Sequence, residues 1–161
     1  MKNHILIYFR LLQNSIFIRS NIKITMESAN KKPIINEQKI STSYRKKLIN
    51  EFIVFCIKEL KLQRPINCKV RLTTNKKETD TYAHFDPNNN KIVVYIGDRG
   101  IADSLRSLSH EIIHMSQRQQ GKLKPNSGET GSSEENEANA KAGVLMRNFG
   151  KIRPEIYRYS S

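Results

Sequence analysis

Two histidines and a glutamate form the pattern with the clearest chemical meaning in this chain. His110, Glu111 and His114 lie in the stretch SLSHEIIHMSQRQQG, residues 107–121. On a helix, residues four apart lie one turn above each other, so the imidazoles of His110 and His114 can converge on one cation. Glu111 is rotated by about 100° from His110 around the helix axis, and it can reach a water molecule held by that cation. An HExxH zinc hydrolase needs this arrangement, with the glutamate as general base.

The apolar residues around the motif predict the helix that carries it. They recur at spacings of four and three and form a single stripe: Ile101, Leu105, Leu108, Ile112 and Met115. At about 100° per residue, His110 and His114 lie on the side opposite this stripe. We therefore expect them to line a cleft or a contact with another element. The alternative interpretation is a pair of surface histidines beside an ordinary helical glutamate.

A catalytic zinc ion usually needs a third protein ligand. The later segment SSEENEANAKAGVLM offers three glutamates: Glu134, Glu135 and Glu137. A metal-bound histidine normally donates its other N–H to an acceptor, and Asn139, four residues after Glu135, has an amide oxygen that can accept. Lys141, four residues after Glu137, cannot. Glu135 is therefore the expected ligand and Glu137 the second choice, while a capping box with Ser132 is the alternative role of Glu135.

The remaining segments predict the elements that position the motif. Amphipathic spacing predicts helices over residues 42–62 and 133–149, the second ending at Gly150. Three segments rich in strand and turn formers predict a small sheet: residues 68–74, 82–90 and 91–98. The expected fold class is α+β, a three-stranded sheet with an N-terminal helix, the motif helix and a glutamate-bearing C-terminal helix. Small residues should let the last two helices approach closely: Ala138, Ala140, Ala142 and Gly143.

Residues 1–41 are interpreted as an N-terminal extension and linker, and residues 42–161 as the folded domain. Residues 4–18 are mostly apolar, but polar residues interrupt them, so they are too short and too broken for a transmembrane helix. Three interpretations stay open: a transit or membrane-surface segment, an N-terminal element of the fold, and an upstream artefact with Met26 as the true start. Membrane association is expected only if residues 1–26 are retained.

The composition limits the partners and the compartment. With 28 Lys+Arg against 15 Asp+Glu, the net charge is +13, which favours contact with nucleic acid, anionic lipid or acidic proteins. The charge is diffuse, and no motif of basic and aromatic residues indicates nucleic-acid binding. Cys56 and Cys68 form no CxxC pair, so cysteine metal sites are not expected and a reducing compartment is favoured.

These motifs together resemble a known family. HEIIH after a strand, followed by a helix with Glu135 and then Asn139, is similar to the minimal core of the gluzincin metallopeptidases, in which HExxH is followed by ExxxD or ExxxN. The likeness is greatest to small proteins assigned as metallopeptidases in tailed phages and other large DNA viruses, over roughly residues 42–158. It implies a zincin-like core, a polypeptide substrate, Glu111 as general base, and a cytoplasmic or virion-associated location. It also implies one zinc ion with three ligands: His110, His114 and Glu135.

Asn139 departs from the aspartate that many gluzincins have at this place. The amide keeps an acceptor for the histidine but lacks the charge that makes the histidine a better ligand. Whether the site would be fully active is therefore open. The group that would stabilise the oxyanion is also open among four side chains able to donate a hydrogen bond: His84, Tyr82, Tyr157 and Tyr159. An extended substrate is expected to pair with the edge strand of the sheet.

Two functions of other classes remain beside a zinc peptidase. One is a catalytically inactive metal-binding or virion structural domain of the same fold, and the other is a basic nucleic-acid-binding module. Glu111 argues against the first, because a scaffold does not need a proton acceptor at that position. The second is supported only by the charge. The substrate sequence and the oligomeric state are not indicated.

Overall fold

Three helices and a mixed sheet form the part of the chain that the structure describes. The structure is a computed structural model, and it describes residues 5–6, 23–27, 41–63, 66–79, 81–124 and 127–159. In chain order the elements are β1 (Ile5–Leu6), β2 (Lys23–Glu27), α1 (Thr42–Glu59), β3 (Lys69–Thr73), β4 (Ala83–Asp86), β5 (Lys91–Tyr95), α2 (Ile101–Gln119) and α3 (Ser133–Ile152). Two short 3₁₀ helices, Lys76–Glu78 and Pro154–Tyr157, are also present among the described residues. The expected α+β class is confirmed.

The sheet has the strand order β1-β2-β3-β5-β4. β3 and β5 are parallel, β4 is antiparallel to β5, and these are the three predicted strands. β2 adds in parallel to β3, and β1 pairs antiparallel with β2. The described sheet thus continues into the segment interpreted as an extension and linker. β4 forms its other edge, and this edge borders the candidate site.

The turn between β4 and β5 follows from its Asp-Pro-Asn-Asn-Asn sequence. The Asp86 carboxylate accepts hydrogen bonds from the backbone N–H groups of Asn88 (3.0 Å) and Asn89 (3.2 Å) and from the Asn89 side chain (2.6 Å). These bonds lower the pKa of Asp86. Asn90 adopts a left-handed conformation, with φ of 47°, which asparagine tolerates better than most residues. The turn fixes the register of β4 and therefore the position of its edge.

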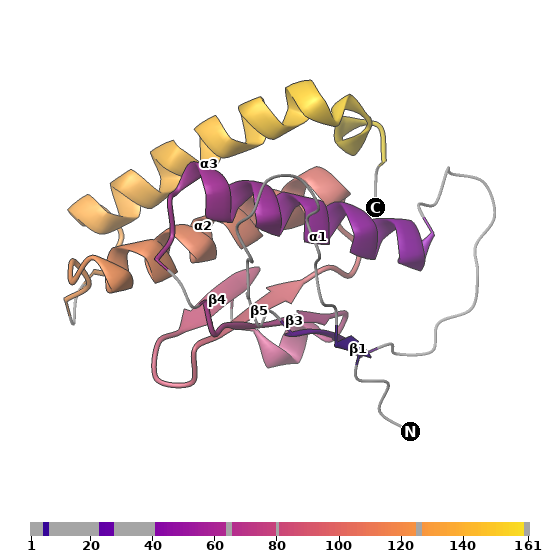
Figure 1. The fold of residues 1–161 in the computed structure, drawn as a ribbon. Coiled ribbons are helices and arrows are strands. Elements are labelled where there is room, and N and C mark those ends of the chain that lie inside the picture. The colour runs from indigo at the N-terminus through magenta and orange to yellow at the C-terminus, as the bar shows by residue number, and fades with distance from the viewer. Residues whose placement is uncertain are drawn as a thin grey trace.

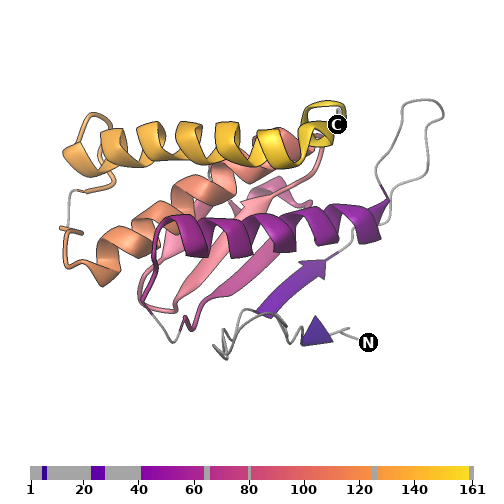
Figure 2. The ribbon, with the colours of Figure 1, turned by 45° about the horizontal axis from the view of Figure 1, so that its top comes forward.

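All three helices lie on the same side of the sheet (Figures 1 and 2). α2 contacts β4, β5, α1 and α3, and it runs opposite to α3, to which the 120–132 segment joins it. The five apolar residues of its predicted stripe are all buried: Ile101, Leu105, Leu108, Ile112 and Met115. α1 adds Phe52 and Cys56 to the same core. Cys56 and Cys68 are both buried free thiols.

The end of α3 differs from the prediction. Gly150 does not end the helix, which continues to Ile152 before Arg153 and Pro154. A Cβ at Gly150 would lie only 2.5 Å from Cε2 of the Tyr157 ring. Glycine is therefore used here to make room for a tertiary contact and not to turn the chain. Proline then stops the helix, because the residue before a proline is disfavoured in the helical conformation.

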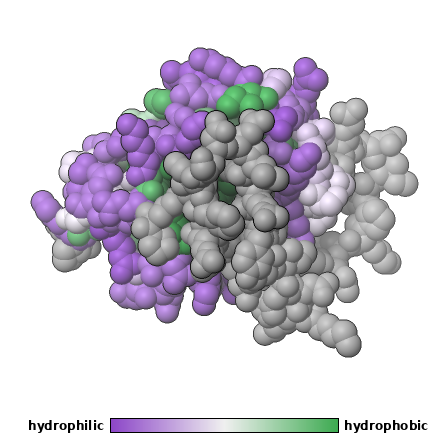
Figure 3. All heavy atoms as spheres, in the orientation of Figure 1, coloured by the Kyte–Doolittle hydropathy of each residue, from purple (hydrophilic) through white to green (hydrophobic). Residues whose placement is uncertain are grey.

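The described surface is mostly polar. Figure 3 shows hydrophilic side chains over most of the coloured part of one face. Within the described residues, the exposed large hydrophobic side chains are Tyr82, Val144, Ile152 and Tyr157. None of the helices in the described part of the chain combines the length and the apolarity needed to cross a membrane.

Candidate metal centre

α2 brings His110 and His114 together on the side that faces the start of α3. Their Nε2 atoms lie 3.0 Å apart, and their rings meet edge to face with centroids 4.6 Å apart. His114 is buried and His110 is partly exposed. The helical spacing predicted this convergence. Two ring nitrogens this close repel each other unless a proton or a cation lies between them.

Glu135 reaches the two histidines from the first turn of α3. Its carboxylate oxygens lie 3.0 Å from Nε2 of His114 and 3.2 Å from Nε2 of His110. The Ser132 hydroxyl caps the helix by accepting a hydrogen bond from the Glu135 N–H at 3.1 Å. The reciprocal half of a capping box is absent at this site, since the Ser132 N–H donates to the Glu129 carbonyl (3.0 Å). The Glu135 carboxylate is thus directed to the histidines and not to the helix end.

The other two glutamates of this segment point elsewhere. Glu137, the second-choice ligand, accepts from Nζ of Lys141 at 2.6 Å and from Nε2 of Gln117 at 2.9 Å. These contacts lower its pKa. Glu134 accepts from the hydroxyl of Ser133 at 2.9 Å. Among the described residues, only His110, His114 and Glu135 form a group able to hold a metal ion, with ligand atoms within 4.8 Å of one another.

Asn139 and Gln117 orient the two histidines. The Asn139 side chain forms a hydrogen bond with His110 that raises the histidine pKa, and its amide oxygen is the atom able to accept from a ring N–H. This partner was predicted from its position after Glu135. His114 Nδ1 lies 2.8 Å from Oε1 of Gln117, a buried partner that the sequence analysis missed. Gln117 follows His114 by three residues, a spacing at which helical side chains can meet, so the sequence did contain the information.

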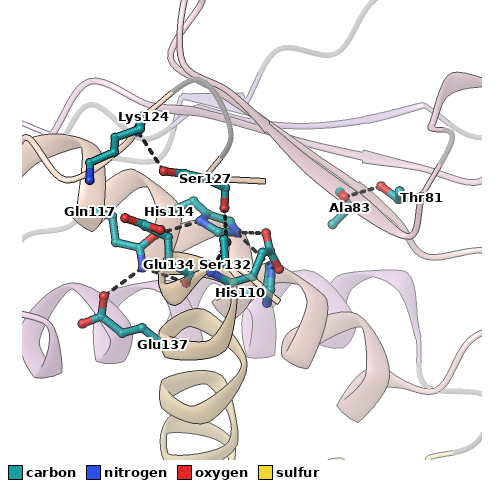
Figure 4. A network of polar contacts seen from close by, with 11 residues as sticks. Thr81, Ala83, His110, His114, Gln117, Lys124, Ser127, Ser132, Glu134 and Glu137 are labelled. Carbon is teal, nitrogen blue, oxygen red and sulfur yellow. Dashed lines mark hydrogen bonds and ion pairs between the residues drawn. The ribbon is translucent and has the colours of Figure 1, made fainter. Parts of the chain in front are cut away.

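Gln117 fixes the tautomer of His114. Its Nε2 donates to the Glu134 carbonyl at 2.9 Å and to the Glu137 carboxylate at 2.9 Å, so both amide protons are used on α3 (Figure 4). Oε1 must therefore face His114 and accept from its Nδ1–H. The lone pair of His114 is left on Nε2, which points to His110 and Glu135. One glutamine thus joins α2 to α3 and presents a nitrogen ligand.

The donor set fits a divalent transition metal. Zinc with bonds of about 2.0–2.1 Å places tetrahedral ligand atoms about 3.3 Å apart. The separations of 3.0, 3.0 and 3.2 Å between the two Nε2 atoms and the Glu135 oxygens are close to this value. Burial and the neighbouring His114 lower the pKa of His110, although Glu135 and Asn139 partly oppose them. A lowered pKa favours the neutral imidazole that a metal requires.

Glu111 lies beside this centre at the edge of the sheet. It is 8% exposed, and its carboxyl accepts a hydrogen bond from the backbone N–H of Phe85 in β4. Burial raises the pKa of Glu111 to about 8, and the nearby Glu135 adds to the rise. A cation held by the three ligands would oppose this shift, because an opposite charge favours the carboxylate. The sequence could not show the Phe85 contact, which depends on how β4 packs against α2.

A cleft of about 1000 Å³ opens over the centre, between α2, β4 and the start of α3. His110, Glu111, His114, Glu135 and Asn139 all line it. Of the four oxyanion candidates, His84 and Tyr82 line the cleft and Tyr157 and Tyr159 do not. The Tyr157 hydroxyl donates to the Met146 carbonyl at 3.0 Å, and Tyr159 packs against the Tyr44 ring.

The close approach of α3 to α2 uses fewer small residues than expected. Ala138 and Ala142 are buried in the core, and Ala142 also lines the cleft. Ala140 is exposed, and a Cβ added at Gly143 would meet nothing within 4 Å. Of the four small residues, Ala138 and Ala142, one turn apart, are therefore the two that pack in the core.

The chain was compared with protein-family models, with curated proteins and with solved structures. None of the three comparisons gives a match. The interpretation of the site thus rests on its residues and their geometry.

Proposed function

We propose that this protein is a zinc-dependent peptidase of the gluzincin type, with His110, His114 and Glu135 as ligands of one zinc ion. The convergence of their Nε2 and carboxylate atoms beside the buried Glu111, at the floor of a cleft, is the observation that carries this proposal. Zinc peptidases use two histidines and a glutamate in this way. Two histidines and one carboxylate also bind Fe²⁺ in another enzyme class, but the buried carboxylate of Glu111 favours hydrolysis.

The chain's own residues suggest how the reaction would proceed. Bound zinc would supply an acidified water molecule and a polarised scissile carbonyl. The Glu111 carboxylate would accept a proton from the attacking water and deliver it to the leaving nitrogen. The Phe85 N–H holds this carboxylate at the edge of β4, close to where a substrate would lie. His84 and Tyr82 are the cleft residues of the original four that could donate a hydrogen bond to the oxyanion.

The edge of β4 also supports a polypeptide as substrate. The Tyr95 N–H donates to the Tyr82 carbonyl at 2.9 Å, so the backbone groups of Tyr82 and His84 face β5. The alternating ladder directs those of Ala83 and Phe85 away from β5, towards the open edge. The Phe85 N–H is bonded to Glu111 and the Ala83 carbonyl to the Thr81 hydroxyl, so the Ala83 N–H and the Phe85 carbonyl are the groups that a peptide could pair with. An extended peptide can add to such an edge through main-chain hydrogen bonds.

Metal analysis and a hydrolysis assay together test this proposal. Purified full-length protein should contain about one zinc ion per chain, and His110→Ala and Glu135→Ala should lose it. Glu111→Gln should keep the metal but hydrolyse a mixed peptide pool at least about 100-fold more slowly than wild type. Wild type without stoichiometric zinc, or Glu111→Gln with full activity, would contradict the proposal. Stoichiometric metal with no hydrolysis by wild type would favour the inactive metal-binding domain.

A further inference from the structure

Two arginines flank the metal centre along one face of α2. Arg106 precedes His110 by one helical turn, and Arg118 follows His114 by one turn. Residues at this spacing lie above one another, and all four line the same cleft. With a rise of 1.5 Å per residue, the two arginines lie about 18 Å apart along the helix axis. This is the length of about five or six residues of extended peptide.

Further cations line the same cleft, and one of them is held in place. The Arg99 guanidinium donates to the Ser107 hydroxyl and to the Asp103 carbonyl, both at 3.1 Å, and lies 4.2 Å from the centre of the Tyr82 ring. Lys124 lines the cleft near the start of α3. Positive charge is therefore present on more than one wall of the cleft.

The cleft has little negative charge to balance these cations. Of the described residues that line it, only Glu111 and Glu135 are acidic, and both belong to the metal centre. Arg118 donates to the amide oxygen of Asn90 at 2.9 Å, and neither it nor Arg106 forms an ion pair within the described part of the chain. By contrast, Arg71 and Arg153 lie 2.7 Å and 2.8 Å from carboxylates. The flanking arginines are thus available to a ligand.

The shape of the cleft favours a peptide over a nucleic acid as the anionic ligand. The open edge of β4 offers main-chain groups that suit an extended peptide. Single-stranded nucleic acid is usually bound by aromatic faces on which bases stack. Tyr82 is the exposed large aromatic side chain of this cleft, and Arg99 lies over its ring. A face that is already covered is a poor platform for a base.

We propose that the cleft selects acidic segments of polypeptides, and that Arg106 and Arg118 bind carboxylate side chains on the two sides of the scissile bond. The inference rests on the proposed peptidase function, since it assigns the substrate class of that site. The spacing of the arginines places the preferred acidic residues about two or three positions from the bond on each side. Arg99 and Lys124 strengthen the positive potential that attracts such a segment.

Binding to the Glu111→Gln full-length protein tests this inference without cleavage of the probe. Three fluorescein-labelled probes are compared by anisotropy: a 12-residue peptide with alternating Glu and Ala, the same peptide with Gln for Glu, and a single-stranded oligonucleotide of equal charge. Each probe is measured with added zinc and with a chelator. The acidic peptide should bind at least about 10-fold more tightly than the Gln peptide, because hydrogen bonds from arginine are stronger to carboxylates than to neutral amides.

A charge-matched pair of double variants separates the cleft from the overall positive charge. Arg106→Gln/Arg118→Gln should abolish most of the preference for the acidic peptide. Arg147→Gln/Lys151→Gln removes the same charge from exposed positions of α3 outside the cleft. This variant should change the preference for the acidic peptide by less than about twofold. All four residues are exposed, so folding should survive, which circular dichroism can verify.

Three results would overturn the inference: equal binding of the two peptides, equal effects of the two double variants, or tighter binding of the oligonucleotide that also depends on Arg106 and Arg118. Failure of the peptidase proposal would look different. It would appear as missing metal or missing hydrolysis in wild type, while the preference for the acidic peptide could still be measured.

Discussion

The helices pack against one another in two regions that follow different rules. In the aromatic cluster, Phe52 of α1 meets Phe149 of α3 edge to face, with centroids 4.9 Å apart, and Phe55 lies 5.4 Å from the same ring. In the candidate metal centre, His110, His114 and Glu135 meet at atom separations of 3.0 to 3.2 Å. The first region needs only apolar volume of suitable shape. The second needs each nitrogen and oxygen to point in one direction.

This difference separates stability from function. Burial of an aromatic side chain stabilises the fold whatever lies in the cleft. The metal centre instead holds two ring nitrogens and a carboxylate close together, an arrangement that is costly until a cation joins it. Removing its side chains should therefore affect ligand binding far more than folding.

The largest expected effect on stability is in the aromatic cluster. Phe52 is completely buried, and Phe52→Ala should lower the free energy of unfolding of the metal-free protein by about 3–5 kcal/mol. His110→Ala, in the same urea titration, should lower it by less than about 1 kcal/mol, because it also removes the close contact with His114. A His110→Ala variant as unstable as Phe52→Ala would show that the metal centre is part of the structural core.

The next effect concerns the third ligand, where α3 offers a matched control. Glu135→Gln should weaken zinc binding by more than about 100-fold, since changes to outer partners alone cost about 10–100-fold. Glu137→Gln should weaken it less than about fivefold, because the new amide oxygen can still accept from Gln117 and the lost ion pair with Lys141 is partly exposed. Competition with a chromophoric chelator measures both affinities. The reverse order would make Glu137 the ligand.

The helices and three of the strands were predictable because burial imposes a period on the sequence. The stripe on α2 is buried at all five predicted positions, and the three strands after residue 66 lie within the predicted ranges. The prediction for Gly150 was wrong because a glycine can serve a tertiary contact as well as a turn. Gly150 contacts the ring of Tyr157, which follows the end of α3. The sequence pattern around Gly150 carries no information about this neighbour.

The convergence of side chains in the candidate metal centre was predictable only where helical spacing fixes their direction. The spacing of His110 and His114, and of Glu135 and Asn139, puts each pair on one side of its helix, and the structure brings all four together. The Phe85 contact to Glu111 and the cationic walls of the cleft were missed. The Phe85 contact and the places of Arg99 and Lys124 depend on how β4 and the loops pack against α2, which no periodicity in the sequence encodes. Arg106 and Arg118 lie four residues before His110 and four after His114, so helical spacing did contain the information for that wall of the cleft.

Gln117 tests whether the orientation of the His114 ring matters for zinc binding. Gln117→Leu keeps a similar volume but removes the acceptor for His114 Nδ1–H, so zinc affinity should fall by about 10–100-fold. The unfolding free energy should fall by about 1–3 kcal/mol, because buried polar groups lose their partners. Gln120→Leu, at an exposed position one turn further from the histidines, is the control. If zinc affinity does not change, Gln117 merely joins the two helices.

The smallest expected effect compares two helix caps of the same kind. Ser132 caps α3 beside the metal centre and Ser41 caps α1 away from it, and each hydroxyl accepts one N–H of its helix. Replacing either serine with alanine should lower the free energy of unfolding by about 1 kcal/mol. Only Ser132→Ala should also weaken zinc binding, because the N–H that Ser132 caps belongs to Glu135 and the same hydroxyl donates to the Ser127 carbonyl at 2.8 Å. Equal zinc affinities for the two variants would mean that Ser132 acts as an ordinary cap, and that the direction of the Glu135 carboxylate is set by the packing of α3 on α2.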